Sequence, residues 1–470
     1  MNALLALSGV VFPLVSFRYV SRILLPTGTG KVALATSVIA YFSMFAQLGI
    51  PTYGVRACAK VREDREKLTR TVHELLGINL VMDLIAYALL AVALVAVPKL
   101  AEERTLYCVV SVTIFLNSIG MEWLYKGLEQ YTYITVRSIA FKIIALIAMF
   151  LMIHEESDYV IYGGISIFAS SASNLLNFFH AGKYIEFRRP AGCDWKRHLR
   201  PVMIFFAMAC AATIYTNLDA LMLGFMKTDA DVGYYNAAVK VKGILVSIVT
   251  ALGAVMLPRS AWYVENGRME DFRRMTRKAL GFVMLLAGAM AVYFAIYAEE
   301  CILFLSGEAY MPAVTPMRII MPTVLLIGLT NIMGIQTLVP LGKEKVVLKS
   351  EIAGAVVDLV LNWVLIPQYG AAGAAAGTLA AEAVVLGVQY WELRGELSSF
   401  FREYKWGRLL VGLALASAAG IWVKALGLRP ILALVLSAVC FFGVYGGFML
   451  WRKEETVVES FGIIRKRIRG

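Results

Sequence analysis

Long hydrophobic runs alternate with short polar connections along this chain, and fourteen of the runs are long enough to cross a lipid bilayer. A helix needs about 20 apolar residues to cover roughly 30 Å of hydrocarbon. We therefore expect an all-α membrane protein with about 14 transmembrane helices. The predicted spans are roughly 3–25, 33–58, 74–97, 105–125, 133–153, 159–181, 201–225, 234–257, 277–298, 313–341, 350–366, 371–391, 407–426 and 430–451.

The positive charges of the polar connections fall almost entirely on every second connection. If the N-terminus is cytoplasmic, the inside connections and the C-terminal tail hold 33 of the 45 Lys and Arg residues, and the outside connections hold six. Connections rich in Lys and Arg stay on the cytoplasmic side of a membrane. The charge pattern therefore predicts that both termini are cytoplasmic.

The amino-acid composition of the chain excludes several classes of function. The chain is 59% hydrophobic and only 17% charged, so no long soluble stretch remains in which a separate catalytic domain could fold. The net charge of +12 is explained by a basic cytoplasmic face beside anionic headgroups, and we expect no nucleic-acid partner. The six cysteines and four histidines show no metal-ligand spacing, so we expect no metal, no cofactor and no enzyme activity.

The sequence also contains an internal repeat, which appears when the chain is aligned with itself at an offset near 204 residues. Because six spans separate the copies, both would have the same orientation, which predicts two six-helix lobes related by an axis along the membrane normal. We expect the lobes at residues 1–198 and 199–394, followed by two extra helices and a basic tail at 395–470. Matching pairs are Leu48-Gly49 with Leu252-Gly253, Leu76-Gly77 with Leu280-Gly281 and, after a one-residue gap, Gly30 with Gly233.

Duplicated lobes are typical of alternating-access transporters, in which one lobe rocks against the other around a site near the middle of the membrane. The alternative is that the duplication only provides stable packing. A charged residue at the centre of a span costs roughly 2.5–3.5 kcal/mol on insertion scales, so such a residue should face a partner or water and is a candidate site residue.

Two arginines in the first span are the strongest candidates. Arg18 and Arg22 are four residues apart and share one helix face, and two guanidinium forks suit a diphosphate. The alternative for each is that its side chain reaches up to the outer headgroups. Lys142, Lys240 and Arg318 are further candidate cations of the same cleft.

Four acids also lie in predicted spans: Asp83, Asp219, Asp358 and Glu382. They either pair with the cations as part of the structure, or one of them takes up the proton or sodium ion that resets the carrier. The residues alone favour the structural interpretation.

Several segments together resemble the bacterial oligosaccharide (O-antigen-type) flippases, the polysaccharide branch of the multidrug/oligosaccharidyl-lipid/polysaccharide exporter superfamily. The resemblance covers nearly the whole chain. It rests on Tyr19–Leu24, Gln47–Arg56, Trp123–Glu129, Asn217–Gly224, Gly233–Lys240 and Pro367–Ala375.

This resemblance implies a carrier of undecaprenyl-diphosphate-linked sugar repeat units, which moves them from the inner to the outer leaflet of the bacterial cytoplasmic membrane for surface polysaccharide export. It also implies partners of that process, a polysaccharide polymerase and a chain-length regulator. Two negative charges moving outward would gain roughly 4.6 kcal/mol per 100 mV of membrane potential, so the scheme needs no ATP.

Other functions stay open at this point. A lipid-linked peptidoglycan precursor flippase would also have 14 spans and a cationic cleft. A cation-coupled multidrug exporter fits less well, because it would lack spans 407–426 and 430–451 and the arginine of the first span. A membrane-embedded glycan polymerase is disfavoured by outside connections of at most about 15 residues. A scaffold for other enzymes is not excluded.

Overall fold

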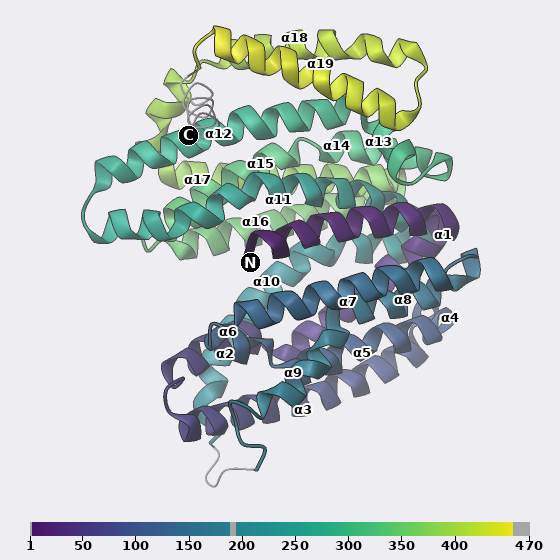
Figure 1. The fold of residues 1–470 in the computed structure, drawn as a ribbon, viewed down its shortest axis with the longest axis vertical. Coiled ribbons are helices and arrows are strands. Elements are labelled where there is room, and N and C mark those ends of the chain that lie inside the picture. Colours follow the sequence, from purple (N-terminus) through teal and green to yellow (C-terminus); the bar gives the residue numbers. More distant parts are fainter. Residues whose placement is uncertain (1, 189–193, 455–470) are drawn as a thin grey trace. The chain divides into compact units, whose positions relative to one another are not determined.

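The computed structural model describes residues 2–188 and 194–454, and nearly all of them are helical (Figure 1). Arg189, Cys193 and the basic tail beyond residue 454 lie outside the described residues. The chain divides into two compact units, Met1–Gly233 and Tyr234–Gly470. Each unit is described by itself.

The first unit contains the spans that the hydrophobic pattern predicts for the first half of the chain. Short helices cap or interrupt the longer ones. Its elements are α1 (Asn2–Gln47), α2 (Ile50–Lys60), α3 (Arg65–Ala96), α4 (Pro98–Glu102), α5 (Arg104–Gly120), α6 (Glu122–Gly127), α7 (Tyr131–Met152), η1 (Glu156–Asp158), α8 (Tyr159–Ile167), η2 (Phe168–Ala172), α9 (Ser173–Ala181), α10 (Lys196–Met226) and the start of α11 (Asp229–Glu265).

The second unit begins within α11 and carries the two C-terminal spans. α18 and α19 pack on each other, and both contact α12. Its elements are α12 (Met269–Ile296), α13 (Ala298–Leu305), η3 (Glu308–Ala313), α14 (Val314–Ile320), α15 (Thr323–Thr330), η4 (Asn331–Leu338), α16 (Glu344–Tyr369), α17 (Ala371–Glu403), α18 (Trp406–Ile421), η5 (Trp422–Leu426) and α19 (Pro430–Trp451).

The long α1 is two helices joined at a sharp break. Leu25 has a positive φ of 55°, and Pro26, the next residue, has no N–H to donate to the helix. In Figure 1 the first part of α1 ends where the chain turns, at the right of the view. The first part corresponds to the predicted span 3–25, and the second part together with most of α2 corresponds to the predicted span 33–58.

With α1 counted as two, the predicted number of spans is confirmed. The described residues hold 12 helices that are long and apolar enough to cross a membrane, one of them being the 49-residue segment Phe12–Lys60. The bent pair Glu308–Ile320 and Thr323–Leu338 is a thirteenth span, and the break in α1 adds the fourteenth.

Two counterpart spans of the repeat are interrupted near the same place. Met121 adopts the left-handed conformation, with φ of 42°, and separates α5 from α6. In the second half, the turn at Met321 and Pro322 separates α14 from α15, and the bend is 43°. The interruptions are about one repeat length apart in the sequence, as a duplicated fold predicts.

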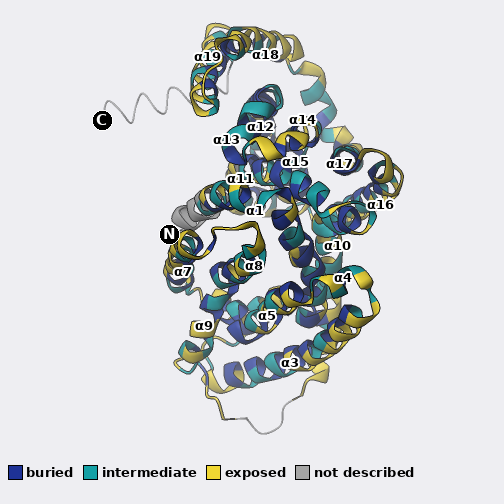
Figure 2. Cartoon of the chain, turned by 90° about the vertical axis from the view of Figure 1, so that its right-hand side faces the viewer, coloured by how far each residue is buried: buried dark blue, intermediate teal, exposed yellow. Residues whose placement is uncertain are grey.

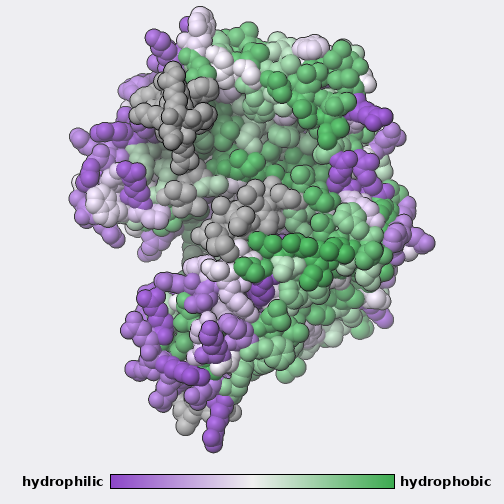
Figure 3. Space-filling view, in the orientation of Figure 1, coloured by the Kyte–Doolittle hydropathy of each residue, from purple (hydrophilic) through white to green (hydrophobic). Residues whose placement is uncertain are grey.

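Each unit is hydrophobic on the outside, as expected for helices in lipid. Leu84 and Val95 of α3 are 73% and 76% exposed, and Val439 of α19 is 66% exposed. Figure 2 shows exposed faces along these outer helices, and Figure 3 shows hydrophilic side chains gathered at helix ends with hydrophobic ones between. The chain therefore carries an apolar surface that only a membrane covers.

The first compact unit ends at Gly233, later than residue 198, where the first lobe was expected to end. α10 contacts α1 and α2, so it belongs with the first unit, although the repeat assigns it to the second half. The lobes at 1–198 and 199–394 and the segment 395–470 describe the duplication and stay a prediction.

Candidate functional site

The arginine pair lies on the face of α1 that does not pack against α7. Val20 and Leu24 lie in one buried cluster with Ala145 and Met149 of α7. Positions two apart on a helix differ by about 200°, so the Arg18 and Arg22 side chains start from the opposite face. Arg18 is half-buried and Arg22 is exposed. Both arginines therefore project from a face of α1 that does not pack against α7.

Tyr19 fixes the rotation of this helix. Its hydroxyl donates a hydrogen bond to the carbonyl of Ile153 at 2.9 Å, and its ring meets Phe150 edge-on with centroids 4.5 Å apart. Because a rotation of α1 would break both contacts, the adjacent Arg18 is held on its own side of the helix. These contacts therefore set the direction in which the arginine pair projects from α1.

Lys142 lies on the face of α7 that meets α1. It precedes Ala145 by three residues and Met149 by seven, so the three side chains share one helix face. The lysine is half-buried and lies about 10 Å along α7 from Met149. Lys142 and the arginine pair are the three predicted site cations of the first unit.

The other two predicted cations belong to the second unit. Lys240 is half-buried on α11, one turn after Asn236, and Arg318 is exposed in the last turn of α14. The five cations thus divide between the two units. A single cleft built from all five stays a prediction.

Asp83, one of the four predicted acids, is hydrogen-bonded to another residue of the first unit. It is 4% exposed, and its Oδ1 accepts a hydrogen bond from Ser118 Oγ of α5 at 2.8 Å. Its Oδ2 is buried without a hydrogen-bond donor among the described residues, and so is Asn79 Oδ1 one turn earlier. None of the described cations forms an ion pair with Asp83, so its carboxyl differs from a structural salt-bridge partner.

Asp358 and Glu382 are buried between the helices of the second unit, and Asp219 is buried on α10. Asp358 and Asn362 of α16 lie against Gly377 of α17, where a Cβ would stand 3.0 Å from Asp358 Oδ1 and closer still to Asn362 Oδ1. The absence of a side chain at Gly377 thus lets this polar pair lie between α16 and α17.

A polar cluster that the sequence did not reveal joins α3 to the start of α10. Glu74 is fully buried and accepts hydrogen bonds from Arg70 Nε at 3.1 Å and Arg197 Nε at 2.9 Å. His198 Nε2 lies 2.8 Å from Glu74 Oε2, and its Nδ1 lies 2.9 Å from the hydroxyl of Tyr53. Nothing in the local sequence distinguishes Glu74 from an exposed acid of an amphipathic helix end.

Arg137 requires a correction. The count of 33 inside cations includes Arg137, although the residue also falls within the predicted span 133–153. In the structure it lies in the second turn of α7 and is only 6% exposed. Its guanidinium donates to the carbonyl of Ser173 at 2.6 Å and to Asn174 Oδ1 at 3.3 Å. This arginine therefore stabilises the contact of α7 with α9.

No group of three or more His, Cys, Asp or Glu residues among the described positions is arranged to hold a metal ion.

Residues 1–263 match the family described as "Polysaccharide biosynthesis protein". A protein of Escherichia coli (strain K12) described as "Putative O-antigen transporter" is 24% identical over 381 residues, covering 80% of this chain and 91% of that protein. A protein of Shigella dysenteriae with the same description is 25% identical over 393 residues, covering 81% and 95%. These matches confirm the resemblance drawn from the sequence motifs.

Two solved structures have the same fold. The lipid II flippase MurJ in an inward closed conformation aligns with a TM-score of 0.61 and 13% identity, covering 92% of this chain and 98% of that one. An inward-facing multidrug resistance transporter of the MATE family aligns with a TM-score of 0.64 and 12% identity, covering 83% and 95%. The chain therefore shares its fold with these two proteins.

Proposed function

Because this chain belongs to the polysaccharide biosynthesis protein family, we propose that it is a flippase for undecaprenyl-diphosphate-linked oligosaccharide repeat units. It moves them from the cytoplasmic to the outer leaflet of the bacterial inner membrane by alternating access, for surface polysaccharide export. Both termini are cytoplasmic in this proposal. The observation that carries it is the arginine pair on a face of α1 that its packing partner α7 does not use.

The arginine pair suits the diphosphate of such a cargo. Arg18 and Arg22 are one helical turn apart, about 6 Å, so their long side chains can both reach one diphosphate. Each guanidinium can donate two parallel charge-assisted hydrogen bonds. Lys142, Lys240 and Arg318 would add positive charge along the path, while the sugars cross in water and the prenyl tail stays in lipid.

The buried acids are candidates for the groups that couple transport to an ion gradient. A carboxyl in a membrane span is costly unless it is paired, protonated or bound to a cation. Among the described residues, Ser118 is the one donor to Asp83 and the second carboxyl oxygen has none, so Asp83 is our first candidate for a proton or Na⁺ site. Asp219, Asp358 and Glu382 are the remaining candidates. The membrane potential alone would also favour outward movement of the anionic cargo.

A peptidoglycan precursor flippase is the second candidate function, because the lipid II flippase MurJ shares the fold over nearly its whole length. A cation-coupled drug exporter is favoured less, since the MATE transporter covers less of this chain. A polysaccharide polymerase and a chain-length regulator are the partners expected of the first function.

The test is transport in liposomes that contain only this protein. Undecaprenyl-diphosphate-linked oligosaccharide is placed in both leaflets, the outer pool is oxidised, and the appearance of fresh sugar outside is followed against protein-free liposomes. We expect protein-dependent transfer of unchanged lipid-linked sugar. A longer glycan product would indicate a polymerase instead, and faster transfer of a lipid-linked disaccharide-pentapeptide would indicate the peptidoglycan function.

A further inference from the structure

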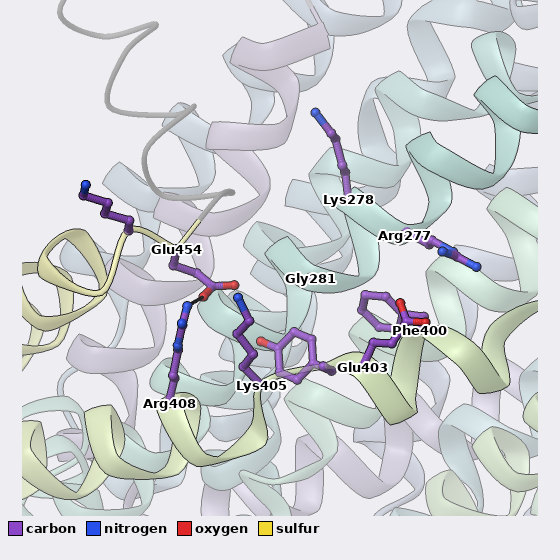
Figure 4. A pocket seen from close by; sticks show the side chains of 10 residues that line it. Arg277, Lys278, Gly281, Phe400, Glu403, Lys405, Arg408 and Glu454 are labelled. Carbon is purple, nitrogen blue, oxygen red and sulfur yellow. Dashed lines mark ion pairs between the residues drawn. The ribbon is translucent and has the colours of Figure 1, made fainter.

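A basic cavity lies at one end of the second unit, and none of its lining residues is assigned to the cargo. Its volume is about 460 Å³, within the usual range for ligand sites, roughly 300–1,000 Å³. Five cations and two carboxylates are among its lining residues, so its lining is strongly positive. The charged residues are Arg277, Lys278, Lys405, Arg408 and Lys453 with Glu403 and Glu454 (Figure 4).

Part of this charge is already compensated within the protein. Arg408 Nη1 lies 3.7 Å from Glu454 Oε2 and donates to the carbonyl of Arg452 at 3.3 Å, and Arg277 donates to Ser399 Oγ at 2.7 Å. Within residues 2–188 and 194–454, no carboxylate forms an ion pair with Lys405 or Lys453. These two ammonium groups are the ones that an anionic ligand would neutralise.

One neutral donor is also available. The hydroxyl of Tyr404, in the turn between α17 and α18, is buried and has no hydrogen-bond partner among the described residues. Burial raises the pKa of this phenol, and the nearby Glu454 carboxylate raises it further, so the hydroxyl keeps its proton. A phosphate oxygen in the cavity would supply the missing acceptor.

The surroundings place the cavity at the level of lipid headgroups. Arg277 and Lys278 lie where the hydrophobic part of α12 begins, and the cavity's other walls are the end of α17, the start of α18 and the end of α19. Trp406 and Trp451 are exposed at the same helix ends, as aromatic residues are at a membrane interface. Leu410 of α18, 61% exposed, follows directly and offers an apolar path for an acyl chain.

We propose that this cavity binds the phosphate headgroup of an anionic phospholipid of the surrounding leaflet, with Lys405 and Lys453 as the principal cations. By the charge pattern this leaflet is the cytoplasmic one. Basic pockets between membrane helices on that side are suited to anionic headgroups. The site shares no residue with the proposed cargo site and does not depend on the nature of the cargo.

The test compares lipid affinity between two double variants of the full chain in detergent. Lys405→Ala with Lys453→Ala removes two cavity charges, and Lys345→Ala with Lys349→Ala removes two exposed charges of α16 in the same unit. The probe is a short-chain phosphatidylglycerol, followed by native mass spectrometry, with phosphatidylcholine and inorganic phosphate as comparisons. Melting curves of both variants check that each is folded.

We expect the cavity variant to bind phosphatidylglycerol at least about tenfold more weakly and the α16 variant to stay within about twofold of the parent. Phosphatidylcholine should bind weakly to all three proteins. Equal losses in the two variants, equal binding of phosphatidylcholine, or full competition by millimolar inorganic phosphate would overturn the proposal. The last result would assign the cavity to a soluble phosphate compound.

Discussion

Gly30 and Gly233, which the internal repeat pairs with each other, lie against one another in the first unit. A Cβ built on Gly30 would stand 2.9 Å from the backbone nitrogen of Gly233 and would overlap the carbonyl of Asp229. A Cβ on Gly233 would overlap the carbonyl of Pro26 and stand 3.0 Å from its Cα. Two helix segments that correspond in the duplication therefore touch through their backbones at these glycines, and neither position tolerates a side chain.

Replacing Gly233 with alanine should destabilise the protein, because the new methyl group meets backbone atoms that have no flexible side chain to move aside. We expect a cost of about 1–3 kcal/mol, as for other overpacked sites, and a clearly lower melting temperature in detergent. The measurement is fluorescence-detected size exclusion after heating.

The matched control is Gly243→Ala in the same helix, α11. No heavy atom lies within 4 Å of a Cβ at this position, and alanine favours helix more than glycine does. This variant should melt at or slightly above the temperature of the parent. Equal melting of the two variants would refute the close backbone contact.

Removing the buried acid of the polar cluster should also lower stability. Glu74→Ala leaves Arg70, Arg197 and His198 facing a site without a carboxylate. Breaking a buried ion pair costs about 3–5 kcal/mol, and we expect the lower end because both arginines are about two-fifths exposed. The melting temperature of the purified variant measures the effect.

The exposed pair Arg62–Glu129 provides the comparison, since its carboxylate side chain is 71% exposed. Glu129→Ala should change the melting temperature very little. If Glu74→Ala behaved in the same way, Glu74 would not hold the start of α10 on α3.

The Asp83→Asn variant tests whether Asp83 couples transport to an ion gradient or only stabilises the structure. The amide keeps an acceptor for Ser118 but no longer binds a proton or cation as a carboxylate does. We expect normal protein levels and loss of the stimulation of transport by a proton or Na⁺ gradient. Ser118→Ala, which removes the hydrogen bond and leaves the carboxyl, should retain that stimulation. An Asp83→Asn variant with full gradient dependence would make Asp83 a structural residue.

Much of this fold was predictable because its main signal is local. Each span is a run of about 20 apolar residues, and the break at Leu25 precedes a proline that marks it. The break at Met121 has no such signal, since a methionine with positive φ is held by its surroundings and not by its own preference.

The clusters of charged residues were less predictable because they depend on which helices meet. Glu74 and Arg197 are 123 residues apart, and only the packing of α10 near α3 brings them together. Arg137 was counted with a connection because the inside-positive rule does not say whether a cation near a helix end is exposed or buried. The face of α1 that carries Arg18, in contrast, followed from the four-residue spacing of its two arginines.

The central claim is that Arg18 binds an anionic cargo, and the most direct measurement is the initial rate of lipid-linked oligosaccharide transfer by Arg18→Ala in liposomes with matched amounts of protein. Loss of charge-assisted hydrogen bonds, each about 1.5–3 kcal/mol, should lower the rate at least about tenfold, with partial recovery in Arg18→Lys. Arg62→Ala, at an exposed surface position, should transport normally. A rate for Arg18→Ala within about twofold of the parent would contradict the proposed cargo site.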